Sequence, residues 1–264
     1  MQPSTSPSTA ISVSDLRMGY GSRILLEEAS FEVERGEILV VLGGSGCGKS
    51  SLMKIMIGLH RPMAGDVRIA GESIVNASPD DRARLQRSLG VMYQSGALFG
   101  SLSVLENVRF PLDQFTDLEL AQKNLTARLL LRQVEMGAAE SLMPAELSGG
   151  MLKRAGIARA MALGCDILML DEPSAGLDPI TAANLDRTIL TLRKSLGFTF
   201  VVVTHELQSI FAIADRAIML DPVSRSIIAE GKPGELKERS TDPRVRQFFN
   251  RQPTAPANPG TGRP

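Results

Sequence analysis

The stretch EILVVLGGSGCGKSSLMKIMIGL, residues 37–59, constrains the fold more than any other part of the chain. Its middle fits the pattern G-x-x-x-x-G-K-[ST], between an apolar run typical of a buried strand and a run typical of a helix. In such a unit the loop amides surround nucleotide phosphates, a lysine reaches the β- and γ-phosphates, and a hydroxyl binds Mg²⁺. We therefore expect an α/β fold with an ATP-phosphate site, in which Lys49 is also catalytic and Ser50 is a metal ligand. The predicted phosphate-binding residues are Gly43, Gly44, Ser45, Gly46, Cys47, Gly48, Lys49, Ser50 and Ser51.

Three further apolar runs, at 89–94, 167–170 and 198–203, resemble strands buried on both faces, because they are short and do not alternate with polar residues. Each run ends in polar residues, as the first does. Open α/β sheets bind their ligands at the carboxyl ends of parallel strands, so we expect these polar groups to meet at one edge. They are Gln94, Asp171, Glu172, Thr204 and His205.

These polar groups have the chemistry of a hydrolysis site. Asp171 is predicted to bind Mg²⁺ directly or through water. Pro173 ends the strand, so Glu172 can turn toward the γ-phosphate and polarise the attacking water as a general base. His205 is predicted to donate a hydrogen bond to the γ-phosphate, and Gln94 to hold Mg²⁺ or the attacking water. An isolated Asp-Glu pair is usually a solvated loop end and a lone histidine is usually structural, but the preceding phosphate loop favours function here.

The stretch ELSGGMLKRAGIARAMAL, residues 146–163, predicts a second helix that begins at glycines. Such an N-terminus can hold an anion, because its first amides have no partner inside the helix. In the predicted sheet this helix lies too far round to reach the γ-phosphate of its own chain. We therefore expect two copies to pack head to tail, each pressing Ser148, Gly149 and Gly150 against the ATP of its partner. A protein that stays monomeric with ATP and Glu172→Gln would contradict this homodimer.

The segment from about residue 100 to 160 differs from the strand-rich parts. TDLE, residues 116–119, fits a capping box in front of an amphipathic run that reaches Val134, and Gly137 is a plausible stop. The segment is therefore predicted to be a mostly helical insertion in a parallel α/β domain.

Composition narrows the classes of partner and compartment. Lys and Arg total 29, equal to Asp and Glu, so the basic excess typical of nucleic-acid binding is absent and we expect no nucleic-acid partner. Two cysteines are too few for a disulfide framework. No apolar run approaches the roughly 18 residues that span a bilayer, and the first residues lack the regions of a secretory signal. These patterns predict a soluble cytosolic protein.

The two cysteines are predicted to differ in reactivity. Lys49 and the helix N-terminus next to Cys47 could lower the pKa of its thiol, so we expect Cys47 to react with alkylating reagents and ATP to protect it. The alternative is that Cys47 is a small, unreactive filler. Cys165 begins a buried strand and is expected to be inert.

The motifs together resemble those of ABC-type ATPases, in the order found in that family, over roughly residues 11–235. They are the phosphate loop, the Gln94 loop, LSGGM at 147–151, LMLDEP at 168–173, the loop through 174–178, and His205. The resemblance implies that Tyr20 stacks on adenine and that Asp178 lies across the dimer interface. Met151 departs from the Gln that most of the family has there. The helix N-terminus is kept, so phosphate binding is expected to survive.

This resemblance implies a RecA-like P-loop NTPase fold: a parallel-sheet α/β core, an N-terminal antiparallel β-subdomain and an inserted α-helical subdomain. The ATP-binding core is expected at 11–94 and 164–235, the helical subdomain at 95–163, and a C-terminal helix at 236–250. The ends, 1–10 and 251–264, are rich in Pro, Ser, Thr and Gly and are predicted to be disordered.

Residues 93–112, 147–163, 171–181 and 242–249 resemble the ATPase of MCE-linked, maintenance-of-lipid-asymmetry transporters of Gram-negative envelopes. The resemblance implies an ATPase dimer beneath two permease copies, on the cytoplasmic face of the inner membrane, with a periplasmic MCE protein that carries phospholipid. A small cytosolic accessory subunit stays possible.

The residues beyond Gln94 are candidates for permease docking. About half of the apolar side chains there are expected to pack under the loop, and the others to form a groove for a permease helix that moves with Gln94. They are Ala97, Leu98, Phe99, Leu102, Val104 and Leu105.

Two other functions stay open. The first is the ATPase of an importer for a small solute. The second is a non-transport ABC ATPase that acts on DNA or ribosomes, although the charge balance gives no support for it. A P-loop kinase would leave the LSGGM motif unexplained.

Overall fold

A computed structural model describes residues 9–251 of the 264-residue chain. The predicted disordered tails lie outside the described residues, except for Thr9, Ala10 and Arg251. Thr9 and Ala10 begin the first strand, and Ala10 is fully buried. The predicted boundary of the first tail is therefore wrong at these two positions, because the apolar side chain of Ala10 packs in the core.

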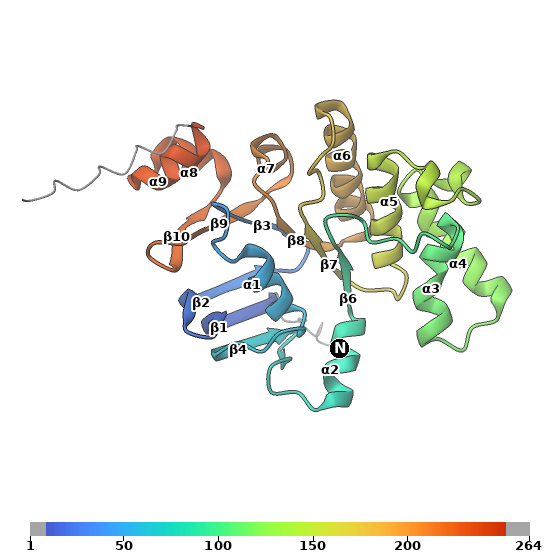
Figure 1. The fold of residues 1–264 in the computed structure, drawn as a ribbon, viewed down its shortest axis with the longest axis horizontal. Helices are drawn as coiled ribbons and strands as arrows, with labels where there is room; N and C mark the ends of the chain where they lie inside the picture. Colours follow the sequence, from blue (N-terminus) through green and yellow to red (C-terminus); the bar gives the residue numbers. More distant parts are fainter. Residues whose placement is uncertain (1–8, 252–264) are drawn as a thin grey trace, which may run out of the picture.

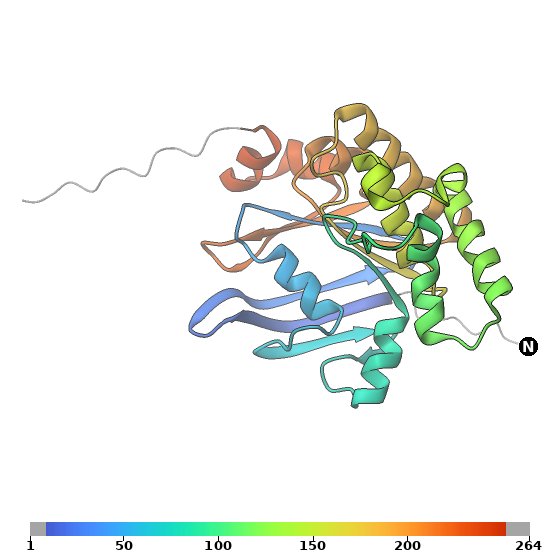
Figure 2. The same cartoon turned by 45° about the vertical axis from the view of Figure 1, so that its right-hand side comes forward.

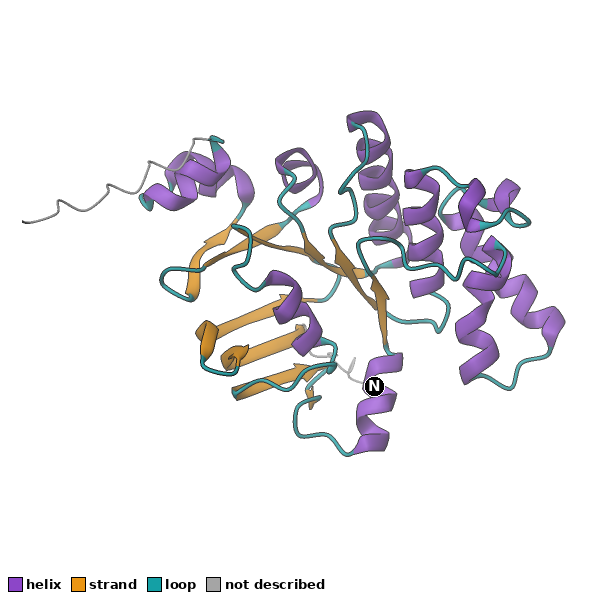
Figure 3. Ribbon diagram, viewed as in Figure 1, coloured by secondary structure: helices purple, strands orange, loops and turns teal. Residues whose placement is uncertain are grey.

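Within residues 9–251 the strands form two sheets, one below the other, with a helix between them (Figures 1 and 3). The antiparallel sheet has the order β2-β1-β4-β5 and contains β1 (Thr9–Tyr20), β2 (Arg23–Glu34), β4 (Ala64–Ile69) and β5 (Glu72–Ser73). The larger sheet has the order β10-β9-β3-β8-β7-β6 and contains β3 (Ile38–Gly43), β6 (Leu89–Met92), β7 (Ile167–Asp171), β8 (Thr199–Val203), β9 (Arg216–Asp221) and β10 (Ser226–Gly231).

The helices lie in four places (Figures 1 and 2), and α2 is the helix at the bottom of Figure 1, below β6. In Figure 1, α1 lies between the sheets, α3 to α5 gather at the right, and α6 to α9 lie along the top. They are α1 (Lys49–Met56), α2 (Pro79–Arg87), α3 (Val104–Phe115), α4 (Leu120–Gln133), α5 (Gly149–Ala160), α6 (Pro179–Leu196), α7 (Leu207–Ile213), α8 (Pro233–Arg239) and α9 (Pro243–Phe249). None of the described helices has the length and apolarity needed to cross a bilayer.

The four strands predicted from apolar runs are neighbours, in the order β3-β8-β7-β6, and all three pairings are parallel. Their carboxyl ends therefore meet at one edge, as the sequence predicts. The strand predicted at 89–94 is shorter in the structure, because the pairing of β6 with β7 ends at Met92 opposite Leu170. Gln94 lies two residues beyond the strand, in a turn where the Gly96 amide donates to the Tyr93 carbonyl at 2.8 Å.

The larger sheet is buried on both faces. Along β3, Ile38, Val40 and Leu42 belong to the core formed with the outer helices, while Leu39 and Val41 belong to the core formed with α1 and the antiparallel sheet. Strands covered on both faces have no need of polar alternation. This explains why apolar runs without alternation are strands here.

The insertion between β6 and β7 is largely helical, but its capping residues differ from those predicted. Thr116 does not start a helix; it ends α3, and its hydroxyl donates to the Leu112 carbonyl at 2.7 Å. The next helix, α4, has Glu119 as its N-cap, with reciprocal bonds to Gln122. The TDLE prediction is therefore displaced by three residues. The fold class is confirmed: an α/β core, an antiparallel N-terminal sheet and inserted helices.

Candidate functional site

The phosphate-binding loop joins β3 to α1 and has glycine where a side chain would collide. Gly43 has a φ of 148°, and a Cβ there would lie 2.4 Å from the Leu220 carbonyl oxygen. Gly48 has a φ of 100° and gives α1 no side-chain cap. The first amides of α1 are therefore available to an anion.

Lys49 adds positive charge to this helix N-terminus. Its ammonium group donates to the carbonyl oxygens of Gly43 at 2.9 Å and Gly44 at 3.2 Å. The two carbonyls hold the ammonium along the loop, where the helix dipole already favours an anion. The loop thus has the shape and the charge to hold phosphates.

A cleft of about 730 Å³ lies beside this loop, within the usual size range of ligand sites. It collects residues from β1, the phosphate loop, the ends of three strands, and α9. The predicted site residues that line it are Tyr20, Gly43, Gly44, Ser45, Gly46, Gly48, Lys49, Ser50, Ser51, Gln94, Glu172 and His205. Arg23, Leu25 and Phe248 line it as well and were not predicted.

Ser50 and Asp171 meet across the sheet edge, although 121 residues separate them in the chain. The Ser50 hydroxyl donates to Asp171 Oδ1 at 3.2 Å. Burial raises the pKa of the Asp171 carboxyl, and the Ser50 hydrogen bond partly opposes that rise. A half-buried carboxylate beside a hydroxyl is an oxygen-ligand pair of the kind that Mg²⁺ accepts together with nucleotide phosphates.

Glu172 and His205 form a second pair at the same edge. His205 Nδ1 lies 2.8 Å from Glu172 Oε1, while Glu172 Oε2 is buried and has no hydrogen-bond partner in the part of the chain that the structure describes. Glu172 has a φ of 48°, rare for a residue with a side chain, and its amide donates to the Val203 carbonyl at 2.8 Å. Strain of this kind persists where surrounding structure holds it and is concentrated at functional sites. One oxygen of Glu172 is thus held by His205, and the acceptor capacity of the other is unused among the described residues.

Lys153, in α5, is a site residue that was not predicted. Its side chain is 5% exposed, and its ammonium group donates to the backbone carbonyl oxygens of Gln94 and, at 3.3 Å, of Glu172. Burial lowers the pKa of this ammonium, while the charges of Glu172 and Asp171 oppose the change. Lys153 therefore links α5 to the Gln94 turn and to the Glu172 backbone. No sequence pattern marks it, because a lysine within a helix is usually solvated.

The second glycine-led helix differs from the first. Ser148 caps α5, and its hydroxyl accepts from the Met151 amide at 3.3 Å. A Cβ on Gly150 would lie 2.4 Å from Thr181 Cγ2, and one on Gly149 would lie 3.1 Å from Leu177 Cδ2. These glycines therefore let α5 approach α6 closely. Ser148, Gly149 and Gly150 do not line the cleft of their own phosphate loop; Gly149 lines a neighbouring groove that also contains Ser50 and Asp171.

Asp178 is also outside the cleft. It is exposed and caps α6, accepting from the amides of Ile180 at 3.0 Å and Thr181 at 3.1 Å. Hydrogen bonds from the Thr181 hydroxyl and amide lower the pKa of the Asp178 carboxyl. Its demonstrated role within one chain is to begin α6.

The prediction for the Cys47 thiol is wrong. Cys47 is 1% exposed and packs beneath the loop, where a Cβ on Gly43 would lie 2.7 Å from its Sγ. Burial raises the pKa of this thiol by more than the charge of Lys49 lowers it. The loop amides surround the anion site while the thiol faces the core. Cys165 is buried too, and burial raises its pKa to about 12, as expected for an inert thiol.

Two aromatic side chains, Tyr20 and Phe248, line the cleft. Tyr20 is 54% exposed, and its hydroxyl lies 3.0 Å from Ser51 Oγ. Phe248 enters the lining from α9, in edge contact with the buried Phe249 at 5.4 Å between ring centroids. Arg244 holds α9 against the sheet through a 2.7 Å contact with Asp221.

The loop after Gln94 is held firmly. Asn107, fully buried, accepts from the Phe99 amide at 2.7 Å and donates to the Phe99, Leu102 and Ser103 carbonyls. Arg159 donates to the Ala97 carbonyl at 2.7 Å, and its guanidinium lies 5.9 Å from the Phe99 ring centroid. Phe99 is 45% exposed although it is large and apolar.

The apolar residues of this loop divide as expected between packing and exposure. Val104 is fully buried, and Leu98 and Leu105 pack against the helical core. Phe99 and Ala97 are exposed.

This architecture and its motifs are shared with known proteins. Residues 26–175 match the family model described as ABC transporter. The chain is 38% identical, over 91% of its length and 88% of the relative's, to the intermembrane phospholipid transport system ATP-binding protein MlaF of Escherichia coli K12. It is 35% identical, over 93% and 92%, to MlaF of Haemophilus influenzae. It is also 36% identical, over 91% and 69%, to the probable ribonucleotide transport ATP-binding protein mkl of Mycobacterium leprae.

Solved structures agree. The post-hydrolysis dimer of the ATP-binding cassette MJ0796 with ADP and Pi has a TM-score of 0.75 at 27% identity, covering 84% of this chain and 98% of that one. The cbiO1 protein of Clostridium perfringens, part of the ABC transporter complex cbiONQ, has a TM-score of 0.81 at 26% identity, covering 88% and 92%. With the phosphate loop, the strand-end carboxylates and these matches together, the chain belongs to the ABC transporter ATP-binding family and is an ATP hydrolase of that family.

Proposed function

We propose that this ATPase powers phospholipid transport between the membranes of a cell envelope. The observation that carries the proposal is 35–38% identity to MlaF proteins over at least nine-tenths of the chain. Their name assigns them to intermembrane phospholipid transport. The ATPase is then peripheral, on the cytoplasmic face of the inner membrane, bound to permease subunits and, through them, to a periplasmic MCE-type protein that carries the lipid.

Within one chain, the cleft residues divide the work of hydrolysis. The phosphate-loop amides and Lys49 bind the phosphates, and Tyr20 receives the adenine. Ser50, Asp171 and Gln94 would hold Mg²⁺, which neutralises phosphate charge when bound. Glu172 accepts the proton of the attacking water through its free Oε2, and His205 fixes the other carboxylate oxygen and reaches the γ-phosphate.

The site is completed by a second copy. Ser148, Gly149 and Gly150 lie outside the cleft of their own chain, so we propose that they bind the γ-phosphate of the ATP held by the partner. Asp178 faces the partner in the same arrangement. The dimeric state of the related MJ0796 cassette supports this geometry. ATP then joins the two chains, and hydrolysis lets them separate.

Phe99 supports the coupling of this dimer to a membrane partner. The exposed ring stands on a loop that Asn107 and Arg159 hold in shape, a few residues beyond Gln94. A shift of Gln94 toward the nucleotide would therefore move the ring as part of an ordered unit. We assign the permease contact to the segment from Gln94 to Leu105.

A second function is favoured by one observation. The mycobacterial relative mkl, 36% identical over 91% of this chain, is named a probable ribonucleotide transport protein. The alternative is thus transport of a small solute. An ATPase subunit does not touch the cargo, so the choice depends on the partners.

The decisive experiment is to purify Glu172→Gln from native membranes with ATP and Mg²⁺ and to identify bound proteins and lipids by mass spectrometry. We expect a multi-span permease, an MCE-domain protein and phospholipid, because blocked hydrolysis keeps the dimer closed. Lys49→Ala, which cannot bind ATP well, is the control and should not retain the closed dimer. A solute-binding protein without lipid would establish the alternative, and ribosomes or DNA-repair proteins would contradict both.

Phe99→Glu tests the docking surface. The charge should abolish stimulation of the ATPase by the permease and lower transport at least tenfold, while nucleotide binding stays unchanged. Binding of a fluorescent ATP analogue and transport in reconstituted vesicles measure the two effects. A parallel loss of nucleotide binding would show that Phe99 serves only to pack the loop.

A further inference from the structure

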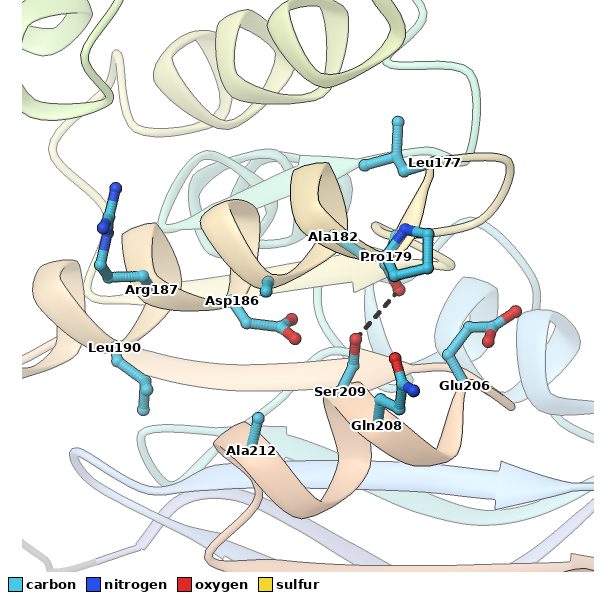
Figure 4. A pocket seen from close by; sticks show the side chains of 12 residues that line it. Leu177, Pro179, Ala182, Asp186, Arg187, Leu190, Glu206, Gln208, Ser209 and Ala212 are labelled. Carbon is cyan, nitrogen blue, oxygen red and sulfur yellow. Dashed lines mark hydrogen bonds between the residues drawn. The ribbon is translucent and has the colours of Figure 1, made fainter.

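A second cavity, of about 330 Å³, lies between α6 and α7, apart from the nucleotide cleft (Figure 4). Part of its wall is aliphatic, formed by Leu177, Pro179, Ala182, Leu190 and Ala212. Among residues 9–251 the nucleotide cleft and this cavity share no lining residue, although Ser174 and Glu206 of the cavity lie close in sequence to Glu172 and His205. Nothing in the hydrolysis mechanism uses this space.

A buried carboxylate opens into this cavity. Asp186, in the second turn of α6, is 5% exposed, and its Oδ1 is buried and has no hydrogen-bond partner among residues 9–251. Figure 4 shows the carboxyl group directed into the space between α6 and α7, with the Arg187 side chain turned away from it. Burial raises the pKa of Asp186, and a hydrogen bond with Ser209 opposes the rise. A buried acceptor without a partner costs free energy, so this group stands ready for a donor.

Arg187 also lines the cavity, but Figure 4 shows its guanidinium turned away from the Asp186 carboxyl group, and the remaining polar groups there are neutral or negative. Ser209 and Ser174, both 3% exposed, lie 3.3 Å apart as a hydroxyl pair, which Figure 4 draws as a dashed line. Glu206 and Gln208 stand at the start of α7. An anion would meet the Asp186 charge. A metal ion would lack ligands, since among residues 9–251 no three His, Cys, Asp or Glu side chains lie close enough together to hold one.

We propose that this cavity binds an ammonium or guanidinium group carried on a short aliphatic chain. The cation donates to Asp186 and the two serine hydroxyls, and the aliphatic chain packs against the apolar wall. Charged donors form the stronger hydrogen bonds to carboxylates, and the alkyl chain gains from leaving water. The ligand is either a diffusible amine or a Lys or Arg side chain of a partner protein.

The position of the cavity links occupancy to turnover. Ser174 follows Glu172 by two residues, and Glu206 follows His205 and contacts its Nε2 at 3.6 Å. A ligand that bridges Asp186, Ser174 and Ser209 ties the chain after β7 to the chain after β8. Occupancy therefore changes the ATPase rate. This last step rests on the proposed roles of Glu172 and His205, while binding itself does not.

Binding is tested with n-butylammonium chloride on the purified protein, at constant ionic strength against NaCl. Thermal unfolding should show a rise in Tm that saturates with n-butylammonium, and 1-butanol, a neutral analogue of similar size, should not reproduce it. Asp186→Asn should weaken the apparent affinity at least tenfold. Glu238→Gln, which removes an exposed carboxylate from α8, should leave it unchanged.

Two variants keep the test decisive. If Asp186→Asn folds poorly, Ala212→Leu fills the cavity while the carboxylate remains, and it should abolish the response. Equal responses of the wild type and of both cavity variants, or an equal effect of NaCl, would overturn the proposal. A response that depends on Asp186 without any change in ATPase rate would leave the site standing and refute only its link to turnover.

Experiments on the assembled complex distinguish the two sources of the cation, a Lys or Arg side chain of a partner and a diffusible amine. Asp186→Asn combined with Glu172→Gln should reduce the amount of one co-purifying partner at least severalfold if that partner inserts a Lys or Arg. Unchanged partners, together with the lost n-butylammonium response, would assign the site to a diffusible amine.

Discussion

The N-termini of α1 and α5 both begin at glycines, yet the structure builds them differently. Gly48 leaves the end of α1 uncapped, and the glycines of the loop avoid collisions with β9 and β1. Ser148 caps α5, and Gly150 is buried against Thr181. The first end is a complete anion site within one chain. The second end combines close helix packing with an exposed Gly149, and in the proposed dimer its ligand is the nucleotide of the partner.

The difference shows that glycines at the start of a helix can serve two different structural roles. Glycine in the loop before α1 frees the backbone to surround an anion. Glycine in α5 allows two helices of the same chain to approach, and only the exposed part of the end is available to another molecule. Four substitutions separate these roles.

Glu172→Gln should have the largest effect. We expect ATP hydrolysis to fall by about 10²–10⁴-fold, the usual contribution of a general base, while ATP binding is kept. Because the first site is complete in one chain and the second is not, the variant should form a dimer with ATP. Steady-state ATPase assays and light scattering measure both effects. A variant that stays monomeric with ATP would break the comparison.

Lys153→Met should come next, since it removes the donor that joins α5 to Gln94 and Glu172. Two part-buried carbonyls then lose a charged partner, typically worth about 1–3 kcal/mol, and we expect the catalytic rate to fall about tenfold with little change in KM for ATP. Lys153→Gln keeps a donor and should recover part of the rate. If Gln and Met behave alike, Lys153 acts only by filling space.

Gly150→Ala tests the packing role in α5. The added methyl group would lie 2.4 Å from Thr181 Cγ2, and overpacking of this kind costs about 1–3 kcal/mol of stability. Thr181→Ser removes that methyl but keeps the hydroxyl bound to Asp178, so the double variant should regain its denaturation midpoint. If the double variant regains the stability of the wild type but its ATPase activity is still reduced, the N-terminus of α5 also contacts nucleotide.

Phe248→Ala should have the smallest effect. Loss of one aromatic wall of the cleft is worth about 0.5–1.5 kcal/mol, so KM for ATP should rise about two- to tenfold at an unchanged catalytic rate. Phe248→Tyr keeps the ring and is the control. An unchanged KM would remove α9 from the nucleotide site.

Local patterns in the sequence predicted the sheet edge well, because each strand and its polar end are contiguous in the chain. Gly43 to Ser50, Asp171 and Glu172 lie at that edge for this reason. Phe248 could not be found in this way, since α9 reaches the cleft only through tertiary contacts such as Arg244 with Asp221. Cys47 was misjudged because neighbouring charge is visible in a sequence, whereas the direction of a side chain under a loop is not.

The Glu119 cap of α4 gives a similar lesson. Thr116 and Glu119 fit a capping box by residue type, but the preceding helix extends to Phe115 and uses Thr116 at its end. Residue type sets which groups can cap a helix, and the neighbouring helix decides which of them does. Lys153 likewise depends on the packing of α5 against the Gln94 turn.

The hydrogen bond from the Glu172 amide to the Val203 carbonyl has a mechanical consequence. It fastens the chain after β7 to the end of β8, and His205 begins two residues beyond that end. The backbone segments that carry Glu172 and His205 are therefore linked to each other where two neighbouring parallel strands end. Gln94 lies in a turn that belongs to neither sheet, and Lys153 of the inserted helix α5 donates a hydrogen bond to its backbone carbonyl. Lys153 also donates to the Glu172 carbonyl, so motion of the inserted helices can reach both the Gln94 turn and the backbone of the Glu172–His205 pair.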